Sequence, residues 1–309
     1  NHRLLHRLDF DPGSAMLTTQ AKSAEDAIGR IQAGEQLAKS AKKPDLETLA
    51  SQYALEPFWG VKKYWALAMG KVSTQQGVDI LARWIRDEND PKVMQSLFQA
   101  SANIQDRGIF DAIVKRLAGD LPHAARRAAL VSLGTQGLSE ALPHLTAAAT
   151  VTGWAGWAQS GAFEGLAKTR APEAVATLME RVEYGATPES CRFLAVQALG
   201  QLGRFQERRL KEDIIDVCIR LLRDPHHRVR RYAMLALRSL GASRALEAIE
   251  SYRQSVSAQE RVEIQRAIDA IRATTRTPEA SLRKEVESLQ TKVRNLESKL
   301  QSVEERLND

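Results

Sequence analysis

Apolar side chains recur along this chain at the three- and four-residue spacing of amphipathic helices. One segment carries Ile80, Leu81, Trp84 and Ile85 on one helical face, and residues 214–222 carry a second such face. Pro91, Pro172, Pro188 and Pro225 lie near the starts of predicted helices, where a missing N–H costs little. This pattern predicts an all-α chain.

Segments of this kind repeat along the sequence. The stretch from Asp224 to Leu237 carries small and apolar residues at the positions that residues 191–199 use, and the two segments close on Leu-Gly at residues 240–241 and 202–203. With Ala236 as the reference, we assign the equivalent positions to Gln36, Ala68, Ala100, Ala129, Gly165, Ala198 and Asp269. A period of roughly 33 residues, with two apolar segments in each unit, predicts stacked helix pairs.

The repeated pattern D-P-x-x-x-V-R-x-x-A-x-x-A-L, complete at residues 224–237, resembles the HEAT-like repeat. The resemblance runs from about residue 24 to residue 272. It implies a HEAT-like α-solenoid of about eight helix pairs over residues 14–274, preceded by a terminal strand or linker in residues 1–13. Such solenoids serve as scaffolds, receptors and enzyme subdomains, so the fold leaves the function open.

The last segment, residues 278–309, has a different period. Valine and leucine alternate there at steps of four and three residues over nearly four heptads, with Pro278 as the expected helix start. Valine at a and leucine at d favour a parallel two-stranded coiled coil, which predicts a homodimer through this segment. Alternatively, the helix packs back on the solenoid. The expected interface contains Val286, Leu289, Val293, Leu296, Leu300 and Val303.

Composition sets expectations for membrane binding, cysteine chemistry and cellular compartment. Charged residues make up 27% of the chain, and its apolar runs are too short to span a bilayer, so we expect no membrane partner. The two cysteines, Cys191 and Cys218, fit no zinc or redox spacing and are expected to be buried thiols in the cytoplasm. Because the sequence begins at Asn1 and not at Met, we expect a chain that is processed, trimmed or cut from a longer polypeptide.

Basic residues occupy one position in several repeats: Arg30, Lys62, Arg192 and Arg230. Equivalent positions of a solenoid line up, so these cations are candidates for a ridge that binds a substrate or partner. The alternative is that each bonds an acidic residue about six positions earlier, as Asp224 lies before Arg230, and thereby joins repeats. Because 38 carboxylates nearly balance 44 cations, nucleic-acid binding is not favoured.

The sequence offers no catalytic or metal-binding motif. The six histidines form no H-E-x-x-H pair, and neither a P-loop nor a nucleophile elbow is present. The acidic run 87–90 precedes Pro91 and is interpreted as a solvated turn that caps a helix. The pair His226-His227 lies in a similar turn. We therefore expect no catalytic residue and no metal in this chain.

One stretch is more specific than the repeat. Residues 56–62, Glu-Pro-Phe-Trp-Gly-Val-Lys, resemble the D-P-F-W-G-V-R segment in the C-terminal helical domain of aminopeptidase N-like zinc metallopeptidases. Residues 10–13 are similar to the passage that leads into that domain, and residues 29–33 resemble its G-R-I-x-A. Lys62 departs from the arginine of this motif and lacks its bidentate geometry.

This resemblance implies a non-catalytic C-terminal domain that limits substrate access and contacts peptide substrates. Zinc would belong only to an upstream catalytic domain of the same polypeptide, which would be the main partner. Two alternatives remain open: a free-standing HEAT-like interaction scaffold that dimerises through its coiled coil, and a basic nucleic-acid-binding solenoid.

Overall fold

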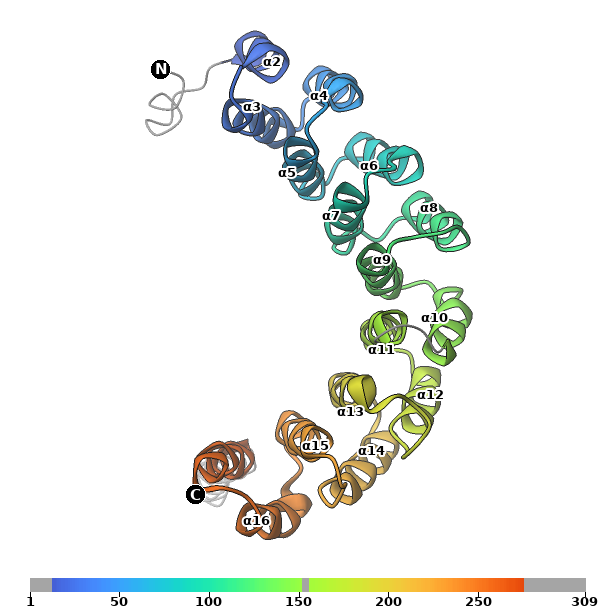
Figure 1. Ribbon diagram of the computed structural model, residues 1–309, viewed down its shortest axis with the longest axis vertical. Coiled ribbons are helices and arrows are strands. Elements are labelled where there is room, and N and C mark those ends of the chain that lie inside the picture. The colour runs from blue at the N-terminus through green and yellow to red at the C-terminus, as the bar shows by residue number, and fades with distance from the viewer. Residues whose placement is uncertain (1–12, 152–155, 275–309) are drawn as a thin grey trace, which may run out of the picture. The chain divides into compact units, whose positions relative to one another are not determined.

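A computed structural model describes residues 13–151 and 156–274 (Figure 1). Their regular secondary structure is entirely helical, which confirms the predicted all-α HEAT-like solenoid. The chain forms two compact units, unit 1 (residues 1–210) and unit 2 (residues 211–309). The predicted coiled coil of residues 278–309 lies outside the described residues, and so does the predicted linker of residues 1–13, except for Gly13.

Unit 1 consists of helix pairs in two rows (Figure 1). In the odd-numbered row α3 packs on α5, and the contacts continue through α7, α9 and α11 to α13; in the even-numbered row α2, α4, α6 and α8 follow one another, and α10 contacts α12. The helices are α2 (Gly13–Ser23), α3 (Ala27–Ser40), α4 (Lys43–Leu55), α5 (Trp59–Met69), α6 (Gln75–Asp87), α7 (Pro91–Ser101), α8 (Arg107–Leu117), α9 (His123–Thr135), α10 (Ala141–Thr150), α11 (Trp157–Thr169), α12 (Glu173–Arg181) and α13 (Glu189–Gly203).

Short turns set the helix boundaries. Asp26, Thr74, Asp90 and Asp106 are N-caps whose side-chain oxygens accept hydrogen bonds from backbone N–H groups of the first helical turn. We call each turn that leads from an even-numbered into an odd-numbered helix a lead-in turn. The lead-in turns hold most of the polar contacts described below.

Burial along the odd-numbered helices sets the register of the repeats. The buried positions Val93, Leu97 and Ala100 of α7 recur one repeat later in α9 at Ala125, Ala129 and Ser132. Ser132, not Ala129, is therefore the equivalent of Ala100, which corrects the register read from the sequence by three residues. α9 is rich in alanine, so several registers place a small residue at the expected position.

Small residues let neighbouring helices approach closely in the odd-numbered row. A Cβ atom on Gly134 of α9 would lie 2.1 Å from the carbonyl oxygen of Gly165 in α11. A Cβ on Gly165 would in turn lie 2.5 Å from the carbonyl oxygen of Leu130. These two helices meet backbone to backbone, so the glycines are required by packing.

Unit 2 begins within α14 (Arg208–Leu221) and continues with α15 (His227–Leu240), η2 (Ser243–Ala245) and α16 (Leu246–Gln254); residues 258–274 are also helical. Arg244 of η2 bonds Glu212 and Asp216 of α14, each at 2.7 Å. These contacts join the helices of this unit across its surface.

Candidate functional site

The cations proposed as a ridge belong to a set of equivalent positions, which we call the ladder. In unit 1 the ladder residues lie in the first turns of the odd-numbered helices, one repeat apart. They are Arg30, Lys62, Met94, Arg126, Gln159 and Arg192. Sequence reasoning assigned three of these six; the register read for α9 placed Arg126 only near the equivalent position, and Met94 and Gln159 are uncharged.

Arg30 and Lys62 link consecutive repeats. Arg30 Nη1 donates to the carbonyl oxygen of Ala24, 2.8 Å away in the preceding lead-in turn, and its Nε bonds Glu56 Oε2 at 2.9 Å. Lys62 Nζ bonds Glu88 Oε2, also at 2.9 Å. In both cases the carboxylate lies 26 residues after the cation, in the next lead-in turn.

Arg126 and Arg192 bind backbone carbonyls. Arg126 Nη2 donates to Gly119 O at 2.8 Å, and Arg192 Nη1 donates to Val182 O at 3.0 Å. Arg192 is fully buried, and its Nε also contacts Glu189 at 3.1 Å. Because its side chain is fully buried, Arg192 does not present its charge on an exposed ridge.

Arg230 of unit 2 follows the same rule. Its Nη1 donates to the carbonyl oxygens of Asp224, at 2.7 Å, and Pro225, at 3.0 Å. The expected partner six residues earlier is correct, but the backbone oxygen accepts this bond, while Asp224 Oδ1 accepts from the His226 N–H at 2.9 Å. The ladder cations thus bind lead-in turns.

Glu88 is the most heavily bonded carboxylate of unit 1. Its Oε2 accepts from Tyr53 Oη at 2.8 Å and Lys62 Nζ at 2.9 Å, and its Oε1 accepts from the N–H groups of Asn89 and Asp90, both at 2.9 Å. The acidic run 87–90 was predicted to be a solvated, helix-capping turn. Asp90 does cap α7, but Glu88 is buried and joins two repeats.

The electrostatics of this group follow from these bonds. Burial alone raises the pKa of Glu88, but the hydrogen bonds from Asp90 N–H, Lys62, Tyr53 and Asn89 N–H outweigh it and hold that pKa below its ordinary value. Burial and the adjacent carboxylate raise the pKa of Tyr53 far above its usual range. The carboxylate therefore stays ionised and the phenol stays neutral.

The α7 repeat departs from this arrangement. Met94 stands at its ladder position, so no cation is available for Asp120, which follows Glu88 by one repeat. Asp120 is exposed and makes no ion pair with any described residue. Arg116 of α8 instead donates to the carbonyl oxygen of Glu88, at 2.9 Å. That carbonyl lies six residues before Met94, as Ala24 lies before Arg30.

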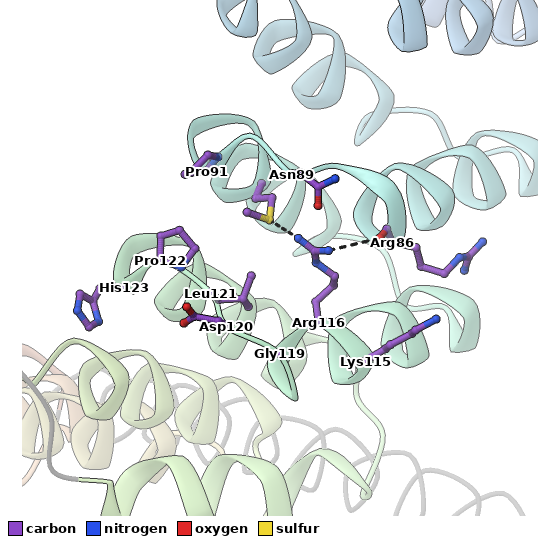
Figure 2. A pocket seen from close by; sticks show the side chains of 11 residues that line it. Arg86, Asn89, Pro91, Lys115, Arg116, Gly119, Asp120, Leu121, Pro122 and His123 are labelled. Carbon is purple, nitrogen blue, oxygen red and sulfur yellow. Dashed lines mark hydrogen bonds between the residues drawn. The ribbon is translucent and has the colours of Figure 1, made fainter.

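A pocket of about 620 Å³ opens at this altered junction (Figure 2). Arg86, Lys115 and Arg116 gather on the side formed by the ends of α6 and α8, whereas Asp120 and His123 lie on the lead-in turn and the start of α9. The pocket is therefore cationic at one end.

The outer face of the odd-numbered row is a second candidate surface. It carries one exposed or half-buried residue per helix at the repeat spacing: Glu35, Leu67, Gln99, Val131, Glu164 and Gln197. We call this line of residues the odd face. Arg127 and Glu164 form an ion pair at 2.6 Å on it, beside a small pocket of about 140 Å³ that Gln197 also lines.

Other expected features have no counterpart that can be described. The six predicted coiled-coil residues, Val286, Leu289, Val293, Leu296, Leu300 and Val303, lie outside the described residues. Among residues 13–151 and 156–274, no three His, Cys, Asp or Glu side chains gather closely enough to hold a metal ion. In the same residues we find no helix with the length and hydrophobicity that crossing a bilayer requires.

Comparison with known proteins supports the repeat type. The family model of the PBS lyase HEAT-like repeat matches residues 229–253. The comparison with curated proteins finds no match.

Similar solved structures include human deoxyhypusine hydroxylase in complex with glycerol, which is 14% identical, with 87% of this chain and 99% of that chain covered and a TM-score of 0.38. An engineered protein is 18% identical, with coverages of 84% and 96% and a TM-score of 0.36. These likenesses are too low to bear on function. The family match therefore supports a HEAT-like helical repeat, and nothing in the comparisons links the chain to aminopeptidase N-like metallopeptidases.

Proposed function

We propose that this chain is a non-catalytic domain that binds peptide or protein segments, and that it forms the C-terminal helical domain of a larger zinc aminopeptidase. The proposal rests on the resemblance of residues 56–62 to the helical domain of that family. The zinc and the catalytic residues would belong to an upstream domain, so no chemical step is assigned to this chain.

The contacts made by residues 56–62 give this short motif a specific structural role. Glu56 accepts the Phe58 N–H at 3.0 Å as well as the Arg30 guanidinium. The Phe58 ring leaves no room for a side chain at Gly60, because a Cβ there would lie 2.6 Å from Phe58 Cε1. Glu88 makes the same two kinds of contact as Glu56 one repeat later, so they describe the role of this position in the repeat.

The same motif reaches the repeats on both sides. Trp59 lies beneath Lys92, with the ammonium 4.3 Å from the ring centroid, and Lys62 reaches Glu88. Residues 56–62 therefore contact the α3 repeat through Arg30 and the α7 repeat through Lys92.

The odd face supports the binding role. It is a continuous line of exposed and half-buried residues on six packed helices, with amides at Gln99 and Gln197 and apolar side chains at Leu67 and Val131. Amide side chains can both donate to and accept from a peptide backbone, and the apolar positions can contact side chains of the bound segment. We propose that a peptide or protein segment lies along this face.

The test begins with the native polypeptide. An antibody against this chain should detect, in source cells, a polypeptide several hundred residues longer than this chain of 34.3 kDa. The upstream coding sequence should contain H-E-x-x-H. The purified full polypeptide should hydrolyse an aminoacyl nitroanilide, lose that activity to a zinc chelator and regain it with zinc.

A second experiment tests the binding role. Substitution of Gln99 and Gln197 by Ala in the full polypeptide should raise KM for a long peptide and leave the nitroanilide unaffected, because only a long substrate reaches the odd face. The matched control replaces Gln75 and Gln76, which lie on α6 in the even-numbered row. A native band no larger than the 34.3 kDa of this chain would remove the aminopeptidase proposal and favour a free-standing scaffold.

A further inference from the structure

The pocket in Figure 2 lies where the contact that the α3 and α5 repeats make with the next lead-in turn is missing. In the α3 and α5 repeats the ladder cation bonds the carboxylate of the next lead-in turn, and the two charges neutralise each other. In the α7 repeat Met94 replaces the cation and Asp120 stands apart. Places where a sequence departs from its own repeat pattern are where function is expected.

We propose that this pocket binds the phosphate group of a small phosphomonoester. Three cations, Arg86, Lys115 and Arg116, line one end of it. No described residue forms a carboxylate ion pair with any of them. A phosphate dianion supplies the missing negative charge, and its oxygens accept charge-assisted hydrogen bonds from guanidinium and ammonium groups.

Arg116 is held in place before a ligand arrives. Its Nη2 donates to Glu88 O at 2.9 Å and contacts Met94 Sδ, while its Nη1 lies 3.5 Å from Arg86 O. Its Nε is buried and has no hydrogen-bond partner. This N–H has no exposed surface, so it is a cost to the fold and not a contact open to a ligand.

Basic residues in the last turn of a helix are common, because they complement the helix dipole. The particular feature here is that the last turns of two neighbouring helices supply all three cations, although Arg86 and Lys115 point away from the Arg116 guanidinium (Figure 2). Arg86 ends α6, and Lys115 and Arg116 end α8, yet all three line the same concavity beside the side chain of Asn89. The volume of about 620 Å³ lies within the range of small-molecule sites, so the phosphate can bring an organic group with it.

Calorimetric titration at low ionic strength tests the proposal, with inorganic phosphate and glycerol 3-phosphate as probes. We expect a dissociation constant on the order of 1 mM. The double variant Arg86→Gln/Lys115→Gln should weaken binding about five- to thirtyfold, because two exposed charge contacts are lost. Asp120→Asn should strengthen it about two- to fivefold, because a like charge is removed from the pocket.

The matched control is Lys22→Gln/Lys39→Gln. It removes the same charge from the last turns of α2 and α3, away from the pocket. Its phosphate affinity should equal that of the wild type, and thermal unfolding should show all variants folded. Equal weakening in the control, unchanged binding in the Arg86/Lys115 variant, or no binding of either probe would overturn the proposal. Tighter binding of a phosphoserine peptide than of glycerol 3-phosphate would overturn the assignment to a small ester.

Discussion

Replacing Glu88 by Gln perturbs one buried carboxylate that four donors share. The side chain keeps its size but loses its charge, and one of its two oxygens becomes an NH₂ group. Whichever way the amide is turned, this NH₂ faces two donors: either Tyr53 and Lys62, or the N–H groups of Asn89 and Asp90. In the first orientation the Tyr53 hydroxyl turns and accepts from the NH₂, so only the Lys62 bond is lost; in the second, both backbone N–H groups lose their acceptor.

The cost follows from burial. An unsatisfied buried donor costs about 1–3 kcal/mol, and bonds to charged groups lie at the upper end of the scale. The Glu88 side chain is 6% exposed, but that of Lys62 is 19% exposed, so water can solvate its ammonium in part. We expect Glu88→Gln to lower the free energy of unfolding by about 2–3 kcal/mol. For a unit of this size, that corresponds to a midpoint lower by about 5–10 °C.

Thermal unfolding followed by circular dichroism at neutral and acid pH measures this effect. Because folding lowers the pKa of Glu88, its contribution is present above the unfolded pKa of about 4.3 and disappears as the pH falls through the lower folded value. The gap between wild type and variant should therefore close only in acid.

The matched control is Glu140→Gln, which removes an exposed carboxylate paired with Arg107 at 2.8 Å. This variant should melt close to the wild type, because exposed ion pairs contribute little. A midpoint for Glu88→Gln within about 1 °C of the wild type, or a gap that persists unchanged in acid, would refute the reasoning.

Three further predictions concern packing, assembly and partners. Gly134→Ala should destabilise unit 1 by about 1–3 kcal/mol in urea unfolding, because its Cβ would meet Gly165 O at 2.1 Å, whereas Gly119→Ala, with only Arg116 O at 3.6 Å nearby, should not. Light scattering should give a dimer mass for the whole chain and a monomer mass without residues 278–309, and a monomeric whole chain would reject the coiled-coil interface. On immobilised DNA at physiological salt the chain should show no retention, since the ladder cations bind lead-in turns and the pocket of Arg86, Lys115 and Arg116 offers a single phosphate site; retention that falls steeply with salt would reverse that expectation.

The fold could be predicted from the sequence because stacked helix pairs require apolar residues at a regular spacing. The repeat period, the pairing of helices and the cap at Asp90 all follow from the residue types along the sequence. The register of α9 does not, because alanine fits several of its positions and only the observed burial separates Ala129 from Ser132. Local patterns specify an element better than they specify its alignment with distant elements.

The contacts of the candidate sites were harder to predict from the sequence, for a different reason. The acceptors of Arg126, Arg192 and Arg230 are backbone carbonyls, which every residue carries and no sequence pattern marks. Arg116 enters its site from a helix of the opposite row, so spacing within the α7 pattern could not reveal it. The recurrence of Glu56, Glu88 and Asp120 at equal steps was the one signal that could have found the altered junction.

The contacts of Arg30 with Glu56 and of Lys62 with Glu88 bear on how such a chain can change its length. Both contacts span 26 residues, which is less than one full repeat. A tandem duplication of the α3 or α5 repeat with its following lead-in turn would therefore copy a cation together with the carboxylate that it bonds. Insertion or loss of a single residue inside that span would instead move the carboxylate to another face of the turn. This part of the solenoid could therefore gain or lose whole helix pairs and keep the same ion pair between neighbouring repeats.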